Sequence, residues 1–429
     1  MPYSKIIAPK LQTTDIFLVK THEFPAQHIR EYARGTRNCE EAVLYLEAKQ
    51  YIPLSNPEPG PDDVTILASA GIGFPKELYE VLFEHLLTAA NHLRWRIRSI
   101  WIVDASNQGA SGVLNERILG DEPSSFNQAR DMLHMINAFR SDFVPPIVGL
   151  GHSMGATSLL QLSLIHPRLL ASLVLFDPIL GSVGEEFANM FYRNSLRPDL
   201  WHSPGEAEEY FRQLWKKWDP RVTELWMQYG LRDTPTVLYP QPGQVTLRTT
   251  KAQEGWLYGR PAFAMPPGSD TPSPPLRAKY PDMNHSIHTL HPFYRPEDAI
   301  IWADLPRIRP SVLYVAPSTR PGTSEKTLAV KVNRTGTGLG GSGGVSIGRV
   351  ASTVVDDVGH NMPFEKPRDC AVIAAEWIGR ELQSWRRDRR DAEQSRDDKS
   401  VGMLALSEEW VRRAKVFYDN VKRARAAKL

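Results

Sequence analysis

Residues 151–155 read Gly-His-Ser-Met-Gly, and the residues on both sides of this motif are as informative about the fold as the motif itself. The apolar segment 146–150 before them predicts a buried strand, and residues 156–162 after them predict a helix. A strand, a G-x-S-x-G turn and a helix, in that order, lift a serine hydroxyl above the carboxyl edge of a sheet. Ligands bind at this edge in open α/β folds. Ser153 is therefore the predicted nucleophile.

The rest of the chain alternates strand and helix patterns. Further strands are predicted at residues 11–20, 42–52, 64–69, 99–104, 171–176, 311–316 and 350–355. Such alternation predicts an α/β protein with a mostly parallel central sheet and helices on both of its faces. Together with the turn at Ser153, it indicates the α/β-hydrolase fold.

The strand pattern stops between residues 184 and 298. Five of the eleven tryptophans and many of the prolines fall in this segment. We therefore expect residues 1–183 and 299–385 to form the two parts of the hydrolase core, with residues 184–298 inserted as a mainly helical lid. Residues 386–429 are rich in charge and predict a C-terminal helical extension.

Composition excludes several classes of function. The chain has 429 residues, and its 51 basic and 49 acidic residues nearly cancel, so no nucleic-acid partner is expected. The two cysteines, Cys39 and Cys370, fit a reducing compartment better than a disulfide framework. No apolar run is long enough to span a membrane, and the first residues lack the apolar part of a signal peptide.

Neither a metal nor an organic cofactor is expected. No histidine or cysteine spacing in the chain is typical of a metal site. Gly336, Gly338 and Gly341 satisfy G-x-G-x-x-G formally, but they follow a predicted helix rather than a strand. The dinucleotide interpretation of these glycines therefore fails, because that motif must follow a strand.

The last three residues are Ala427, Lys428 and Leu429. Ala-Lys-Leu differs by one residue from Ser-Lys-Leu, a peroxisomal address that a receptor reads. The alternative is a helix that ends in small and basic residues, which suit the helix dipole. We expect the peroxisomal matrix as the location and the import receptor as a partner.

A serine hydroxyl needs a base to take its proton. In the chain order Ser, acid, His, the base lies in the loop after the last strand. That loop, residues 358–367, contains His360, which is the predicted base. His152 directly precedes the nucleophile and is expected to shape the turn instead.

The acid has two candidates. Its usual place follows the strand predicted at 311–316, but Ser318 stands there, and the nearest carboxylate, Glu325, comes several residues later. Asp177 follows the strand predicted at 171–176, beside the nucleophile, and could hold the tautomer of His360. We favour Asp177 as the acid. Glu325 stays open as its substitute, and Asp177 could instead cap a turn before Pro178.

An oxyanion hole needs two fixed N–H donors. One is expected to be the backbone amide of Met154, directly after the nucleophile. The second is expected from the loop after the strand at 64–69, at the backbone amide of Ile72. This loop begins with Ala70 where related loops often carry histidine, but the donor is main chain and does not depend on that side chain.

Several segments carry a resemblance to a known family. They are Gly73-Phe74-Pro75-Lys76-Glu77-Leu78-Tyr79, the Ser153 turn, Phe176-Asp177-Pro178, Lys217-Trp218-Asp219-Pro220-Arg221-Val222, Tyr229-Gly230-Leu231-Arg232, Gly359-His360 with Pro363 and Glu365, and the C-terminal tripeptide. With them the chain resembles the fungal peroxisomal branch of the α/β-hydrolases. That branch includes toxin-biosynthesis hydrolases, a yeast peroxisomal lipase and the acyl-CoA hydrolase of the mycophenolic acid pathway. The resemblance implies a triad of Ser153, His360 and Asp177, with acyl-CoA thioesters as substrates.

The expected function is that of a serine hydrolase. We expect an acyl-CoA thioesterase of fungal secondary metabolism that works through an acyl-enzyme. The alternatives are a carboxylesterase, lipase or lactonase on a lipid or polyketide-type ester, and a non-catalytic ligand-binding scaffold. Epoxide hydrolases and dehalogenases are excluded because they place aspartate at the position of Ser153.

The expected substrate is a small acyl compound. A CoA thioester would favour basic side chains near the mouth of the pocket, because they bind its phosphates. The candidates are Lys76, Arg193, Arg197 and Arg232, each of which could equally be a surface charge. The sequence leaves open whether the chain forms a homodimer.

Overall fold

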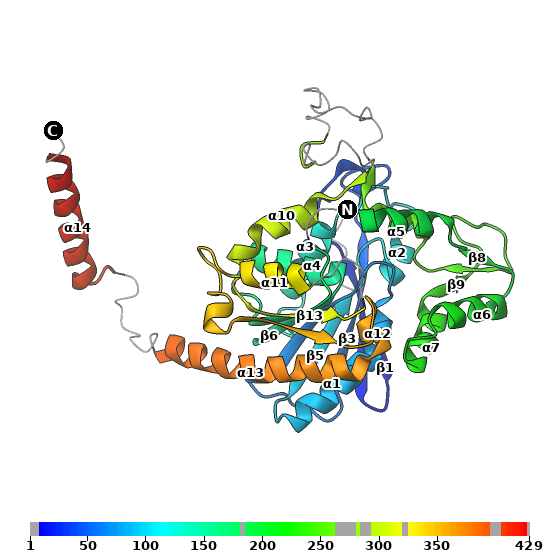
Figure 1. Cartoon of the computed structure of the whole chain (residues 1–429), viewed down its shortest axis with the longest axis horizontal. Helices are drawn as coiled ribbons and strands as arrows, with labels where there is room; N and C mark the ends of the chain where they lie inside the picture. The colour runs from blue at the N-terminus through cyan, green and yellow to red at the C-terminus, as the bar shows by residue number, and fades with distance from the viewer. Residues whose placement is uncertain are drawn as a thin grey trace. The chain divides into compact units, whose positions relative to one another are not determined.

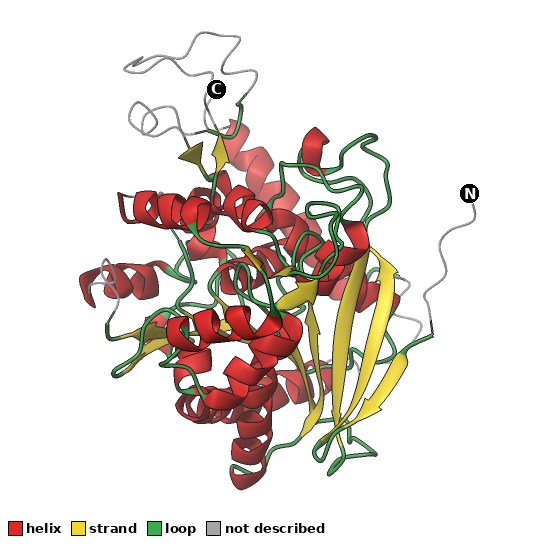
Figure 2. Ribbon diagram, turned by 90° about the vertical axis from the view of Figure 1, so that its right-hand side faces the viewer, coloured by secondary structure: helices red, strands yellow, loops and turns green. Residues whose placement is uncertain are grey.

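One twisted sheet runs through the larger part of the chain (Figures 1 and 2). The computed structural model describes residues 8–180, 185–261, 280–283, 293–319, 325–394 and 405–426. Within these residues, nine strands lie side by side in the order β1-β2-β3-β5-β4-β6-β7-β13-β14. In that order their bounds are Lys10–Thr13, Phe17–Pro25, Tyr45–Pro53, Ile97–Val103, Val64–Ser69, Ile147–His152, Ser172–Phe176, Ser311–Pro317 and Val350–Val355.

The sheet changes from antiparallel to parallel at β5. The pairs from β1 to β5 are antiparallel, and those from β5 to β14 are parallel. The predicted mostly parallel sheet is thereby confirmed. The prediction of one strand over 11–20 is wrong, because a turn at Thr14 separates β1 from β2. The Phe17 amide donates to Thr14 Oγ1 at 2.9 Å, and the Thr14 amide donates to the Phe17 carbonyl at 2.9 Å.

Helices cover both faces of the sheet (Figure 1). On one face lie α3, α4, α10 and α11, which span Ser125–Ala138, Met154–Ile165, Pro296–Asp304 and Glu325–Arg334. These helices share one hydrophobic cluster with the sheet, which contains Met132, Leu159 and Ile301 from the helices and Leu67 from β4. On the other face lie α1 (Glu80–His92) and, up to residue 381, the first part of α13 (Pro367–Gln394).

Between β7 and α10 the chain leaves the central sheet. This segment contains α5 (Glu185–Leu196), α6 (Pro204–Leu214), α7 (Pro220–Tyr229) and α8 (Lys251–Tyr258). It also forms a small antiparallel sheet in the order β8 (Leu200–Trp201), β10 (Val245–Leu247), β9 (Leu231–Asp233), and a pair of β11 (Arg260–Pro261) with β12 (Phe293–Tyr294). Helices were expected in this segment, whereas its small sheets were not predicted.

The chain divides into two compact units, residues 1–381 and 382–429. The second unit contains α14 (Glu408–Ala426), none of whose side chains is buried. The predicted targeting residues Ala427, Lys428 and Leu429 lie outside the described residues. None of the described helices is long and apolar enough to cross a membrane.

A buried ion cluster joins β3, β5 and the loop after β4. Lys76 is 0% exposed, and its Nζ lies 2.7 Å from Asp104, 2.8 Å from Glu47 and 3.2 Å from Glu77. Burial lowers the pKa of Lys76, but the three carboxylates outweigh it and raise the pKa overall. Asp104 also accepts from the Lys76 and Ala110 amides. Lys76 therefore stabilises this loop from inside the fold. The expectation that Lys76 lies at the mouth of the pocket is wrong.

Replacing Lys76 by methionine should strongly destabilise the fold. The Lys76→Met substitution leaves the buried Asp104 without its cation, while Glu77 keeps Lys49 at 3.3 Å. Breaking a buried ion pair in this way costs about 3–5 kcal/mol. Denaturant unfolding of the purified chain measures the loss. Lys10→Met is the matched control: Lys10 pairs with Glu23 at 2.9 Å, but its side chain is 77% exposed. Equal stability of Lys76→Met and wild type would contradict the bracing role.

Candidate active site

Ser153 lies in a strained turn between β6 and α4. Its backbone has φ 55° and ψ −121°, a conformation that a residue with a side chain rarely adopts. Two glycines permit this turn. A Cβ at Gly155 would lie 2.1 Å from the Ser69 carbonyl oxygen, and one at Gly151 would lie 2.5 Å from Ala156 Cα. The glycines therefore let β6, α4 and the end of β4 meet.

His360 lies within hydrogen-bonding distance of both other residues of the predicted triad, Ser153 and Asp177. His360 Nε2 is 2.9 Å from Ser153 Oγ, and His360 Nδ1 is 2.6 Å from Asp177 Oδ2. A carboxylate accepts only, so in this geometry Nδ1 carries the proton and Nε2 faces the serine hydroxyl as an acceptor. This is the arrangement in which a histidine can take the proton of a serine nucleophile.

Asp177 is held at the end of β7 by the sheet itself. Its φ is 42°, and its amide donates to the Val315 carbonyl at 2.9 Å. Ser318, which occupies the usual place of the acid, accepts from the Asp357 amide at 2.9 Å instead. Ser318 thus helps to fix the loop that carries His360. Glu325 begins α11, and its side chain lies outside the described residues.

A second carboxylate fixes the histidine loop from its other end. The Gly359 amide, directly before His360, lies 3.1 and 3.3 Å from the two carboxylate oxygens of Glu365. Glu365 belongs to α12 (Met362–Glu365), whose Phe364 carbonyl accepts from the Asp219 amide at 2.8 Å. The loop is therefore connected both to the core and to the segment between β7 and α10.

His152 and Tyr79 join the loops on both sides of the nucleophile. His152 Nε2 lies 2.8 Å from the His360 carbonyl oxygen, and its Nδ1 lies 2.8 Å from Tyr79 Oη. The carbonyl can only accept, so Nε2 donates and Nδ1 accepts from the tyrosine hydroxyl. Tyr79 Oη in turn accepts from the Gly71 amide at 3.0 Å. Sequence reasoning assigned His152 to the turn and missed Tyr79, which lies 73 positions before His152 in the chain.

The two residues predicted to supply the oxyanion donors line the same cavity as Ser153. Met154 begins α4, so its amide has no partner within the helix. Ile72 lies between two amides that are engaged: Gly71 donates to Tyr79, and Gly73 donates to Gln108 Oε1 at 2.7 Å. Both Ile72 and Met154 line the cavity. These bonds on either side of Ile72 fix the loop without using its own amide.

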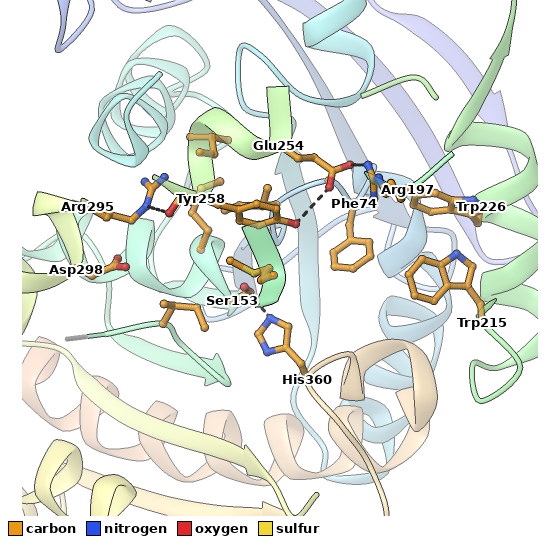
Figure 3. A pocket seen from close by; sticks show the side chains of 16 residues that line it. Phe74, Ser153, Arg197, Trp215, Trp226, Glu254, Tyr258, Arg295, Asp298 and His360 are labelled. Carbon is orange, nitrogen blue, oxygen red and sulfur yellow. Dashed lines mark hydrogen bonds and ion pairs between the residues drawn. The ribbon is translucent and has the colours of Figure 1, made fainter. Parts of the chain in front are cut away.

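The cavity has a volume of about 320 Å³ and mostly apolar walls (Figure 3). Trp215 and Trp226 are the two tryptophans that line it. Trp215 stacks on Trp218 with ring centroids 4.1 Å apart, and Phe74 lies against both rings. The aromatic side chains of the inserted segment thus form one wall, although the sequence could not say which tryptophans would do so.

Polar side chains interrupt this apolar lining at two places. At one place Arg197 Nη2 donates to Glu254, and Tyr258 Oη donates to Glu254 Oε2 at 3.3 Å. At the other lie Arg295 and Asp298, and burial raises the pKa of Asp298 to about 7. Arg295 and Asp298 were not predicted, because nothing in the sequence around them indicates a ligand.

The remaining basic candidates are not arranged as phosphate ligands of this cavity. Arg197 is inside it but is paired with Glu254, and Arg232 is paired with Glu116 at 2.7 Å. Arg193 is exposed on α5 and does not line the cavity. Among the described residues, no group of three or more His, Cys, Asp and Glu side chains could hold a metal ion.

The fold, the strained serine and its histidine define a hydrolase, and the chain belongs to the alpha/beta hydrolase family, which it matches over residues 66–373. A relative over nearly the whole length is type I acyl-CoA thioesterase mpaH' of Penicillium brevicompactum. It is 35% identical over 422 residues, covering 93% of this chain and 95% of the relative. Abhydrolase domain-containing protein AFT2-1 of Alternaria alternata is 26% identical over 235 residues, covering 54% of this chain and 83% of the relative.

A solved structure shows the same fold. Peroxisomal alpha-beta-hydrolase Lpx1 of Saccharomyces cerevisiae superposes with a TM-score of 0.65. The alignment covers 96% of this chain and 99% of the yeast chain, at 16% sequence identity.

Removing the Tyr79 hydroxyl should slow the chemistry of Ser153. Tyr79→Phe removes the hydrogen bonds of the tyrosine hydroxyl with the Gly71 amide and His152 Nδ1, and so releases two loops that flank the nucleophile. We expect a fall of about 10- to 100-fold in the rate of Ser153 labelling by a fluorophosphonate, less than the 10²–10³ that loss of an oxyanion donor costs. Stability should fall by about 1–3 kcal/mol, because buried groups lose their partner.

Tyr314→Phe is the control for this prediction. Tyr314 is also buried, and its Oη hydrogen-bonds Thr335 Oγ1 at 2.8 Å, but it lies in β13 outside the cavity lining. We expect a similar loss of stability with an unchanged labelling rate. If both variants slow labelling equally, Tyr79 acts through general stability and not through the two loops.

Proposed function

We propose that the chain is an acyl-CoA thioesterase, with Ser153 as nucleophile, His360 as general base and acid, and Asp177 as its partner. The observation that carries the proposal is the 35% identity to the thioesterase mpaH' across 93% of the chain. The hydrogen bonds from Asp177 through His360 to Ser153 support the same chemistry. In place of a metal, the reaction uses a serine that the histidine activates.

The first half-reaction forms an acyl-enzyme. Ser153 Oγ attacks the thioester carbonyl while its proton passes to His360 Nε2. The carbon–sulfur bond breaks as the tetrahedral intermediate collapses, and CoA leaves as a thiol with the proton from His360. Asp177 stabilises the protonated imidazole throughout this step.

The second half-reaction releases the acid. Water attacks the acyl ester of Ser153 and gives its proton to His360 Nε2, which returns it to Ser153 Oγ. In both steps negative charge develops on the carbonyl oxygen, and the amides of Met154 and Ile72 are the proposed donors to it. We further propose that residues 184–298 act as the lid, because their side chains supply the aromatic wall of the cavity.

Hydrolysis of a carboxylic ester or lactone is the second candidate. It is favoured by the arrangement of the basic side chains: Lys76 is buried in its ion cluster, and Arg197 and Arg232 are paired with carboxylates. The described cavity residues therefore give little sign of a phosphate site, and an ester substrate would need none.

Release of thiol from a panel of acyl-CoAs, run beside p-nitrophenyl esters, separates the two candidates. We expect the wild-type chain to release CoA with a higher kcat/KM than it cleaves the esters. Ser153→Ala should lower CoA release by about 10⁴-fold or more, because loss of a serine nucleophile removes the covalent route. Asp177→Asn should lower kcat by about 10⁴-fold, because the histidine then adopts the wrong tautomer.

Other outcomes of this panel would overturn the proposal. Ester cleavage without CoA release assigns the chain as an esterase or lactonase. A chain that cleaves neither and whose Ser153 does not react with a fluorophosphonate is a ligand-binding scaffold. Full activity of Asp177→Asn would move the acid to another carboxylate, and Glu325→Gln would then be the variant to measure.

We also propose that the enzyme works in the peroxisomal matrix, in fungal secondary metabolism. The support is the tripeptide Ala427-Lys428-Leu429, which the import receptor would bind. A fluorescent protein fused ahead of the full chain should colocalise with a peroxisomal marker in fungal cells. Removal of the three residues should leave it in the cytosol, whereas peroxisomal fluorescence after their removal would contradict the proposal.

A further inference from the structure

The loop between β5 and α2 (Gly109–Asn115) contacts two parts of the active site that are distant in the chain. One part is residues 70–75 after β4, here named the Ile72 loop. The other is the first turn of α8, in the segment between β7 and α10. Gln108, the last residue before α2, is 3% exposed and hydrogen-bonds both parts.

The side-chain amide of Gln108 joins these two parts. Its Oε1 accepts from the Gly73 amide at 2.7 Å, and its Nε2 donates to the Gln253 carbonyl at 3.3 Å. Nε2 also donates to the Asn107 carbonyl at 3.2 Å. A backbone amide only donates and a backbone carbonyl only accepts, so these partners fix the orientation of the side-chain amide. The Ile72 loop is thereby linked to α8 through one buried side chain.

The start of α8, to which Gln108 is bonded, is itself well fixed. The Thr250 and Gln253 side chains form a capping box with the backbone there. The Gly109 amide donates to Thr249 Oγ1 at 2.8 Å, and Asn107 Nδ2 donates to the Gln253 carbonyl at 3.4 Å. The carbonyl that Gln108 binds therefore has a defined position relative to β5 and α2.

α8 also packs directly on the Ile72 loop. Gly73 has φ 82°, and a Cβ there would lie 2.7 Å from Glu254 Cδ. Ile72, Gly73 and Glu254 line the cavity, whereas Gln108 does not. Figure 3 shows Glu254 of α8 and Phe74 of the Ile72 loop among the side chains around the cavity. Gln108 thus joins two parts of the cavity wall without belonging to its lining.

We propose that Gln108 is a positioning residue for the oxyanion hole: by joining Gly73 to α8, it fixes the Ile72 amide for the developing negative charge. The inference rests on the proposed function, in which the amides of Ile72 and Met154 are the oxyanion donors. It adds that the segment between β7 and α10 supports the reacting site in addition to shaping the cavity.

The physical basis is preorganisation. A donor stabilises the transition state only if it is already in place when the charge develops, and losing one donor costs about 10²–10³ in rate. Ile72 is held on one side by the bond from Gly71 to Tyr79 and on the other by the bond from Gly73 to Gln108. Loss of one support misplaces the donor without removing it, so a smaller fall of about 10- to 100-fold is expected.

Gln108→Met tests the inference, because it removes both side-chain bonds and keeps a similar volume. We expect the rate of Ser153 labelling by a fluorophosphonate to fall by about 10- to 100-fold. On an ester or thioester that the chain cleaves, kcat should fall with little change in KM, as for an interaction made in the transition state. Labelling at the wild-type rate, or a change in KM alone, would overturn the inference.

Gln108→Glu separates the two bonds and serves also if Gln108→Met does not fold. Its carboxylate still accepts from the Gly73 amide but cannot donate to the Gln253 carbonyl. Protonation restores that donor. The labelling rate relative to wild type at the same pH should therefore be low at alkaline pH and rise as the pH falls. A ratio that stays low at every pH would show that the link to α8 plays no part.

Gln50→Met is the matched control. Gln50 is also 3% exposed, and its side chain lies 3.2 Å from His22 Nε2 and 3.4 Å from Asp142 Oδ1, but it belongs to β3 and does not line the cavity. We expect a similar loss of stability in thermal unfolding with an unchanged labelling rate. Equal slowing in Gln50→Met and Gln108→Met would assign the effect to general stability and contradict the inference.

Labelling separates this inference from the thioesterase function, because the phosphonyl oxygen uses the oxyanion hole without any CoA. Slower labelling of Gln108→Met would support the role of Gln108 even if no CoA thioester is cleaved. Unchanged labelling would contradict that role even if CoA thioesters are good substrates. A wild-type Ser153 that does not react at all would overturn both.

Discussion

The backbone of Ser153 has φ 55° and ψ −121°, a sparsely populated conformation. Holding a residue in such a conformation costs about 1–3 kcal/mol of folding free energy. It persists because β4, β6 and α4 meet at glycines with no room for a side chain. The closest approach is between residue 155 and the Ser69 carbonyl, at the end of β4. The loop that follows β4 carries Ile72, the second oxyanion candidate, which lines the same cavity as Ser153.

Hydrogen bonds from distant parts of the chain hold the loops around this turn. Tyr79 and His152 link the Gly71 amide to the His360 carbonyl, and the sheet places Asp177 on the other side of the imidazole. Lys76 connects the same loop to β3 through Glu47 and to the end of β5 through the buried Asp104. The reacting groups thus stand on loops, but each loop is tied to the rigid sheet by at least one buried polar contact.

Elements and residues could be predicted from the sequence where the pattern that indicates them lies within a short stretch of chain. The strand, turn and helix around Ser153 lie within some twenty consecutive residues, and the order of nucleophile, acid and base follows from the connectivity of the sheet. Asp177 could be selected because Ser318 has no carboxylate. The turn at Thr14 was missed because strand-like residues flank it on both sides.

Pairings across the fold could not be predicted in this way. Lys76 has a side chain that is usually exposed, but here it is buried and bonds to Glu47 and Asp104, 29 and 28 positions away. Tyr79 and His152 are 73 positions apart, and Arg295 Nε donates to the carbonyl of Tyr258, 37 positions away. Each of these depends on tertiary packing that no short window of sequence contains.

The lining of the cavity has a consequence for how such enzymes diverge. Ser153, Met154, Ile72 and His360 come from the core, whereas Met190, Arg197, Trp215, Trp226, Glu254, Leu257 and Tyr258 come from the segment between β7 and α10. Substitutions in that segment can therefore remodel the shape and polarity of the cavity while the reacting groups keep their positions. One lineage can in this way acquire many acyl preferences from a single inherited reaction, with the inserted segment as the part on which selection acts.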